Sequence, residues 1–175
     1  MRNYKKIGFL IAIVALIAGT TFLSSCGVYS FRDVSIPDTV KSVQIAPIVN
    51  RAPYVNTQLA GNLTDRLRRK IQNQTRLRVS NDPGADLVVN ATITDYSLST
   101  SGVSSTGASL NRLTVTVQVS VTKGRDPAAP PQEYTLSRPF DFQATKSLQD
   151  AERELFEEIV RGLTDDIFNR LFSNW

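Results

Sequence analysis

The sequence contains no histidine among its 175 residues, and this absence narrows the chemistry open to the chain. Histidine is the side chain that most often acts as a general base at neutral pH, so every Ser-His or Cys-His catalytic arrangement is excluded. A zinc site would lack histidine and could draw on only one cysteine. The nine glycines are scattered and never take the spacing of a phosphate-binding loop. We therefore predict a protein that is not an enzyme and that carries no metal and no cofactor.

The single cysteine, Cys26, stands directly behind an apolar run. A charged start with Arg2, Lys5 and Lys6, an apolar middle and a small-residue cut site are typical of a secretory signal peptide. Because the segment ends in Leu-Ser-Ser-Cys, it resembles a bacterial lipobox, which implies cleavage before Cys26 and lipidation of its sulfur. The alternative is an uncleaved membrane helix, since about 20 apolar residues span a bilayer. The lipobox interpretation divides the chain into a signal peptide (1–25), a lipidated leader (26–39) and a single domain (40–175).

The net charge of +4 does not indicate a nucleic-acid partner. Three of the 20 Lys and Arg residues belong to the signal peptide, which leaves 17 against 16 Asp and Glu in the mature chain. Such a balanced count gives no broad attraction to a polyanion. We therefore expect contact with the membrane through the lipid on Cys26, and no nucleic-acid binding.

Hydrophobic periodicity predicts an α+β domain. Alternating apolar residues indicate four strands and a shorter fifth one, at 40–48, 85–99, 110–123, 133–144 and about 77–79. The small polar residues of 99–109 indicate a hairpin loop. Apolar residues at helical spacing predict helices over about 57–73 and from Ser147 onward. We expect two amphipathic helices to pack on one face of a roughly four-stranded mixed sheet.

The first predicted helix combines an apolar stripe with a basic cluster. The stripe consists of Leu59, Leu63, Leu67 and Ile71. The cluster consists of Arg66, Arg68, Arg69 and Lys70. One interpretation is a solvated face whose cations lie near the helix C-terminus, where the helix dipole favours them. The other interpretation is a patch for an anionic lipid head group or partner.

The final helix carries a long apolar stripe and an acidic first half. Its acidic residues include Glu152, Glu154, Glu157 and Glu158. Paired carboxylates can act in catalysis, but no companion base or metal ligand accompanies them, so we interpret them as a solvated helix face. Trp175 at the end of the chain either packs into the domain or contacts a partner, and the sequence leaves both open.

Taken in chain order, six segments resemble the lipopolysaccharide-assembly lipoprotein family LptE, in a divergent branch. They span nearly the whole mature chain, and none is a catalytic signature. The segments are Cys26-Gly27-Val28-Tyr29-Ser30-Phe31, Asn50-Arg51-Ala52-Pro53, Leu63-Thr64-Asp65-Arg66-Leu67, Ala91-Thr92-Ile93-Thr94-Asp95-Tyr96, Leu110-Asn111-Arg112-Leu113-Thr114-Val115 and Asp165-Asp166-Ile167-Phe168-Asn169.

The resemblance implies a lipoprotein of the outer membrane that faces the periplasm. Gly27 directly after the cysteine, in place of aspartate, also favours the outer membrane. The resemblance further implies two helices on a four-stranded sheet, and a role as plug or partner of the LptD β-barrel during lipopolysaccharide assembly. Basic residues would contact lipopolysaccharide, and by chemistry alone the candidates are Arg66, Arg68, Arg69, Lys70 and Arg112. The alternative function is an accessory lipoprotein of another envelope complex, in secretion or linked to peptidoglycan.

Overall fold

The computed structural model describes residues 36–82, 84–103, 109–126 and 128–172. These residues form two long helices and a six-stranded sheet, so the predicted α+β class is confirmed. The sheet has more strands than the roughly four predicted. The short strand predicted at about 77–79 is present at Arg78–Ser80, and a two-residue strand at Val49–Asn50 is added. The elements are β1 (Ser42–Ile45), β2 (Val49–Asn50), α2 (Leu59–Gln74), β3 (Arg78–Ser80), β4 (Leu87–Val103), β5 (Ser109–Lys123), β6 (Gln132–Gln143) and α3 (Leu148–Phe172).

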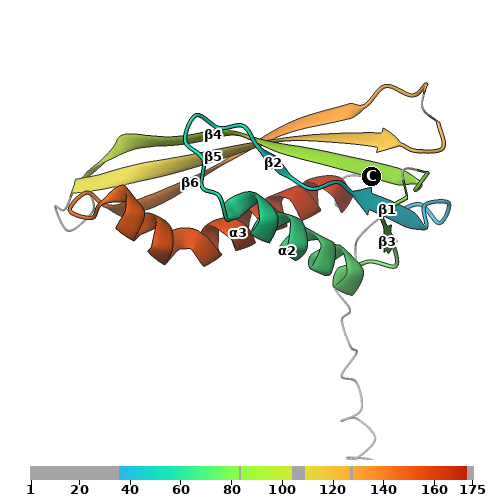
Figure 1. Ribbon diagram of the computed structural model, residues 1–175, viewed down its shortest axis with the longest axis horizontal. Coiled ribbons are helices and arrows are strands. Elements are labelled where there is room, and N and C mark those ends of the chain that lie inside the picture. The colour runs from blue at the N-terminus through green and yellow to red at the C-terminus, as the bar shows by residue number, and fades with distance from the viewer. Residues whose placement is uncertain (1–35, 83, 104–108, 127, 173–175) are drawn as a thin grey trace, which may run out of the picture. The chain divides into compact units, whose positions relative to one another are not determined.

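The sheet is mixed, as expected. Its strand order is β3-β1-β4-β5-β6. Strand β2 pairs with β4 on the same side as β1, at residues that lie farther along β4. Strand β1 lies parallel to both of its neighbours, whereas β4, β5 and β6 are antiparallel. Helices α2 and α3 lie side by side along one face of this sheet (Figure 1). The domain is therefore a sheet with one face covered by helices.

The core lies between the helices and the sheet and follows the two periodicities of the sequence. Every second residue of β5 is buried: Leu113, Val115, Val117, Val119 and Val121. All four stripe residues of α2 are buried as well: Leu59, Leu63, Leu67 and Ile71. Because each such side chain contributes about 1.5–3 kcal/mol when fully buried, these two rows supply a large part of the stability.

A bulge in β4 changes which residues face the core. The register with β5 shifts between Ile93 and Asp95, so one extra residue enters β4 there. Up to that point Leu87, Val89, Ala91 and Ile93 are buried, as predicted from the alternation. Beyond it Tyr96 faces the core. Strand β4 then continues to Val103, so the segment 99–109, predicted to be a loop throughout, is partly strand.

Two local features concern a proline inside β6 and the start of α2. Pro139 lies in β6, which is the last strand of the sheet, and the register opposite Thr114 is regular there. An edge position tolerates proline because no outer neighbour needs its missing N–H. Helix α2 begins at Leu59, two residues later than the predicted start at about 57. Asn56 instead accepts a hydrogen bond through Oδ1 from the backbone N–H of Gln58, at 3.1 Å.

Two predictions concern residues that the structure does not describe. Residues 26–35 of the predicted leader, Cys26 included, and Trp175 lie outside the described residues, so their predicted roles stay predictions. Among the helices that are described, none is both long enough and apolar enough to cross a membrane.

Candidate functional site

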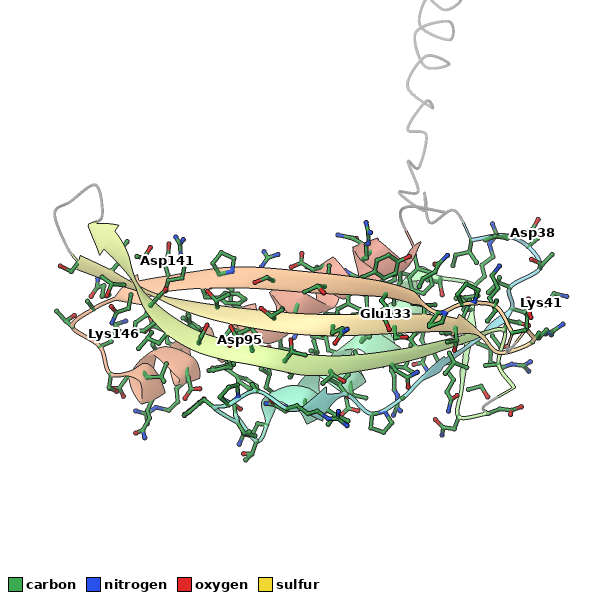
Figure 2. All side chains as sticks on the ribbon, turned by 90° about the horizontal axis from the view of Figure 1, so that it is seen from above. Asp38, Lys41, Asp95, Glu133, Asp141 and Lys146 are labelled. Carbon is green, nitrogen blue, oxygen red and sulfur yellow. The ribbon has the colours of Figure 1, made fainter. Side chains whose placement is uncertain are left out.

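The face of the sheet opposite the helices is polar, and no other element of the described ranges covers it (Figure 2). Its central row comes from β5 and alternates with the buried row of that strand. The row consists of Thr114, Thr116, Gln118, Ser120 and Thr122. Exposed residues of β6 continue it: Glu133, Thr135, Ser137 and Asp141. This open sheet face presents hydroxyl, amide and carboxylate groups to solvent, which suits contact with a hydrated surface.

Arg112, one of the predicted contact residues, lies at one end of the open sheet face. Its Nε and Nη2 donate to Oδ1 and Oδ2 of Asp141 at 2.7 and 2.8 Å. The two residues are direct cross-strand partners on β5 and β6. Hydrogen bonding by Arg112 holds the pKa of the Asp141 carboxyl below its usual range, and the same bonds raise the pKa of Arg112. The cation is therefore neutralised within the domain.

Two of the predicted contact residues on α2 face α3. Arg66 Nη1 lies 3.0 Å from Glu157 Oε2, and Lys70 Nζ lies 2.6 Å from Asp165 Oδ1. Lys70 Nζ also lies 4.9 Å from the centre of the Phe168 ring, within the range of a cation–π contact. These residues join the two helices, so their charges are already partnered.

The remaining two candidates on α2 differ sharply from each other. Arg68 Nη2 donates to the carbonyl oxygen of Ile45 at 2.7 Å, and its buried Nε has no hydrogen-bond partner among the described residues. Arg69 is exposed, and within the same residues it makes no ion pair or hydrogen bond. The structure thus scatters the five predicted contacts over two layers of the domain, and Arg69 is the one that makes neither an ion pair nor a hydrogen bond within the described part.

A buried carboxylate, predicted from the sequence to be part of a solvated helix face, joins three segments. Glu152 of α3 is only 8% exposed. Its Oε2 accepts from the Tyr54 hydroxyl at 3.0 Å, and its Oε1 accepts from Asn56 Nδ2 at 3.4 Å. Tyr54 in turn stacks on Tyr96, with ring centroids 5.4 Å apart. Burial is the main cause that raises the pKa of Tyr96, and Glu152 raises it further.

The spacing of α3 contained a signal for this burial. Glu152 lies four residues after Leu148, which packs against the core, and seven residues before the buried Ile159. It therefore belongs to the apolar stripe rather than to the acidic face. The prediction of a solvated face was wrong for Glu152, whereas Glu154, Glu157 and Glu158 are exposed as expected.

A second buried carboxylate holds the start of the domain. Asp86 Oδ2 accepts from the backbone N–H groups of Lys41 and Ser42 at 2.8 and 2.9 Å, and from Ser42 Oγ at 3.0 Å. Arg125 forms an ion pair with the other carboxylate oxygen. The hydrogen bond from Lys41 is the largest cause that lowers the pKa of Asp86. The contacts of both buried carboxylates are structural, and the described residues contain no cluster of ligands that could hold a metal ion.

Comparison with solved structures gives the same fold in proteins of low sequence identity. A minor lipoprotein from Acinetobacter baumannii has a TM-score of 0.51 and 15% identity, over 78% of this chain and 95% of that one. The hypothetical protein CT253 from Chlamydia trachomatis has a TM-score of 0.51 and 13% identity, over 75% of this chain and 95% of that one. At these identities the likeness shows the fold alone.

Comparison of the sequence with known proteins and protein families gives a more specific result. No curated protein matches this chain. The family LptE, described as lipopolysaccharide-assembly, matches residues 40–171. That range runs from just before β1 to the last turn of α3, and it includes every strand of the sheet. The chain belongs to the LptE family.

Proposed function

We propose that this protein is an outer-membrane lipoprotein that assists lipopolysaccharide assembly as the plug or partner of an LptD-type β-barrel. The observation that carries the proposal is the family match over residues 40–171, which is essentially the whole described domain. The open sheet face supports it, because the lumen of an outer-membrane barrel is polar and a polar sheet can lie against it without burying unpaired groups.

In this proposal the chain is anchored through Cys26. Residues 1–25 are removed as a signal peptide, residues 26–39 form the lipidated leader, and residues 40–175 form the domain on the periplasmic side of the outer membrane. A single acyl chain binds a membrane only marginally, and two or more anchor it stably. The measured mass of the mature protein tests this step, since it should equal that of Cys26–Trp175 plus its acyl groups.

The protein acts here by contact, and no covalent bond is made or broken. Exposed cations lower the cost of handling a phosphorylated glycolipid by pairing with its anions. Arg69 is the strongest of the five predicted contacts, because its charge has no partner among the described residues. Arg66, Lys70 and Arg112 would each have to give up an ion pair with Glu157, Asp165 and Asp141, respectively, before they could bind such a ligand.

Depletion of the protein tests the proposed function. Lipopolysaccharide at the cell surface should fall while its synthesis continues, and the wild-type gene should restore it. Normal surface lipopolysaccharide after depletion, together with failure of another envelope process such as secretion, would favour the accessory-lipoprotein alternative.

A further inference from the structure

The four large apolar side chains that are most exposed in the described residues come from β2, from the segment that follows it and from the second half of β4. They are Val49, Tyr54, Val55 and Leu98, at 46%, 41%, 50% and 49% exposure. Val49 belongs to β2 and pairs with Thr92 of β4, whereas Leu98 lies farther along β4 itself. Tyr54 stacks on Tyr96 of the same strand. An apolar border on a sheet edge is a feature that monomeric proteins avoid unless a partner covers it.

Among the described strands, none pairs with β4 on this side once β2 ends. The last contact is the hydrogen bond from the backbone N–H of Arg51 to the carbonyl oxygen of Ile93, at 2.9 Å. From Asp95, labelled in Figure 2, to Val103, no other described strand pairs with β4 on the side opposite β5. We call this stretch the free edge of β4.

The register identifies the backbone groups that face outward. Ile93 turns its carbonyl toward β2 and lies opposite Val117, and beyond the bulge Tyr96 lies opposite Val115. Since orientation alternates along β5, Val115 has the same orientation as Val117, so Tyr96 also turns its N–H and C=O outward. By the same alternation, Leu98 and Thr100 do so too. Within the described residues these groups have no hydrogen-bond partner.

The other two edges of the sheet are protected. Strand β3 has only three residues and begins with the exposed Arg78. Strand β6 contains Pro139, and α3 reaches it through the ion pair of Arg138 with Asp166 and the contact of Arg170 with Tyr134. Short length, proline and covering elements are the usual devices against unwanted pairing. The free edge of β4 instead carries apolar side chains beside its unpaired backbone.

We infer that the free edge of β4 binds an extended loop segment of the barrel partner as an added strand, with apolar side chains at alternate positions of that segment. The inference rests on the proposed function, because the barrel is the partner named there. A row of alternating donors and acceptors is complemented by another extended backbone and not by acyl chains. Register shifts at both ends, near Asp95 and Gly102, keep the regular stretch short. Such bulges disfavour sheet-to-sheet pairing of two copies but leave room for a short segment.

Site-specific photocrosslinking of the full lipidated chain in the native outer membrane tests the inference. A photoreactive residue at Leu98 or Thr100 should capture the barrel protein, and mass spectrometry should map the link to a short non-barrel loop. The matched control places the same residue at Glu158, which is exposed on α3, in the helix layer on the other side of the sheet from the open sheet face. Capture of a second copy, of lipopolysaccharide alone, or of nothing at positions 98 and 100 would overturn the inference.

Two substitutions test the role of the free edge of β4 independently of the proposed function. Thr100→Pro removes an outward N–H without removing a bond to β5, and Leu98→Lys places a charge on the apolar border. Each should reduce barrel recovery about ten-fold, the effect of losing roughly 1.4 kcal/mol of binding, while Glu158→Lys leaves it unchanged. Circular dichroism must show that each variant is folded. If wild-type protein recovers the barrel and both variants do so equally well, the edge inference fails and the proposed function stands. If wild-type protein recovers no barrel, the proposed function itself fails.

Discussion

Arg138 of β6 lies across helix α3 and reaches Asp166, with its Nη1 at 2.8 and 2.9 Å from the two carboxylate oxygens. The path of this side chain passes directly over Gly162. A Cβ atom at position 162 would lie 2.6 Å from Arg138 Nε, which is closer than real Cβ contacts allow. Glycine at this buried helical position therefore makes room for the ion pair that ties α3 to the edge strand.

Gly162→Ala tests this relationship through a double-mutant cycle with Arg138→Ala. Alanine favours a helix interior over glycine by about 1 kcal/mol. In the wild-type background that gain is offset, because the new methyl group displaces Arg138 from Asp166. In the Arg138→Ala background the full gain should appear in the free energy of unfolding, measured with urea. An equal gain in both backgrounds would show that Arg138 and Gly162 are independent.

Glu152 should be the acidic residue of α3 whose loss costs most stability. Glu152→Ala leaves Tyr54 and Asn56 without their acceptor at a site that is mostly buried. We expect the free energy of unfolding to fall by about 1–3 kcal/mol, the cost of a buried polar group without its partner. The control is Glu158→Ala on the exposed face of the same helix, which should change stability by less than about 0.5 kcal/mol. Equal effects of the two substitutions would contradict the structural role of Glu152.

Substitution of Arg69 should weaken binding without changing stability, whereas substitution of Arg66 should lower stability. Arg69→Ala should leave the unfolding free energy within about 0.5 kcal/mol and weaken binding of fluorescently labelled lipopolysaccharide about ten-fold, since one charged contact contributes roughly 1.5–3 kcal/mol. Arg66→Ala should instead lower stability by about 0.2–1 kcal/mol through loss of the Glu157 pair. Arg161→Ala, at an exposed arginine of α3, is the control for charge alone. Unchanged binding by Arg69→Ala would remove Arg69 from the contact set.

Asp86 should make the domain sensitive to acid. Hydrogen bonds from the Lys41 and Ser42 N–H groups lower its pKa in the folded protein, so the unfolded chain takes up a proton first as the pH falls. The stability that Asp86 contributes is therefore complete above about pH 4 and is lost as the pH falls through the lowered value. Asp86→Asn should flatten the dependence of the unfolding midpoint on pH in this range, whereas Asp126→Asn, at an exposed aspartate, should not. A pH profile of Asp86→Asn parallel to wild type would contradict this role.

The sequence predicted the regular parts of the fold because burial there follows a simple period. The buried alternate residues of β5 and the apolar stripe of α2 occupy the faces that their spacing indicates. The bulge at Thr94 could not be foreseen, since an inserted residue changes the face of every later side chain without a distinct residue type. For that reason Tyr96 and Leu98 were assigned no role by periodicity.

The candidate site was predicted less completely, because charge pairing depends on tertiary contacts. The basic cluster of α2 is visible in the sequence, but its ion pairs reach residues about ninety positions away, on α3. A charge that looks free along the chain can therefore be neutralised in the fold, as Lys70 is by Asp165. The buried position of Glu152 was in principle readable from its helical spacing, and its partners Tyr54 and Asn56 were not.

The proposed function requires that this LptE-family chain works bound to an outer-membrane barrel. Its most direct test is affinity purification of the full lipidated chain from solubilised outer membrane, with the molar ratio of every recovered protein measured by quantitative mass spectrometry. We predict one β-barrel protein of the LptD type in an amount close to that of the chain itself. Recovery of the chain without any barrel, or with a different envelope complex in that amount, would contradict the claim.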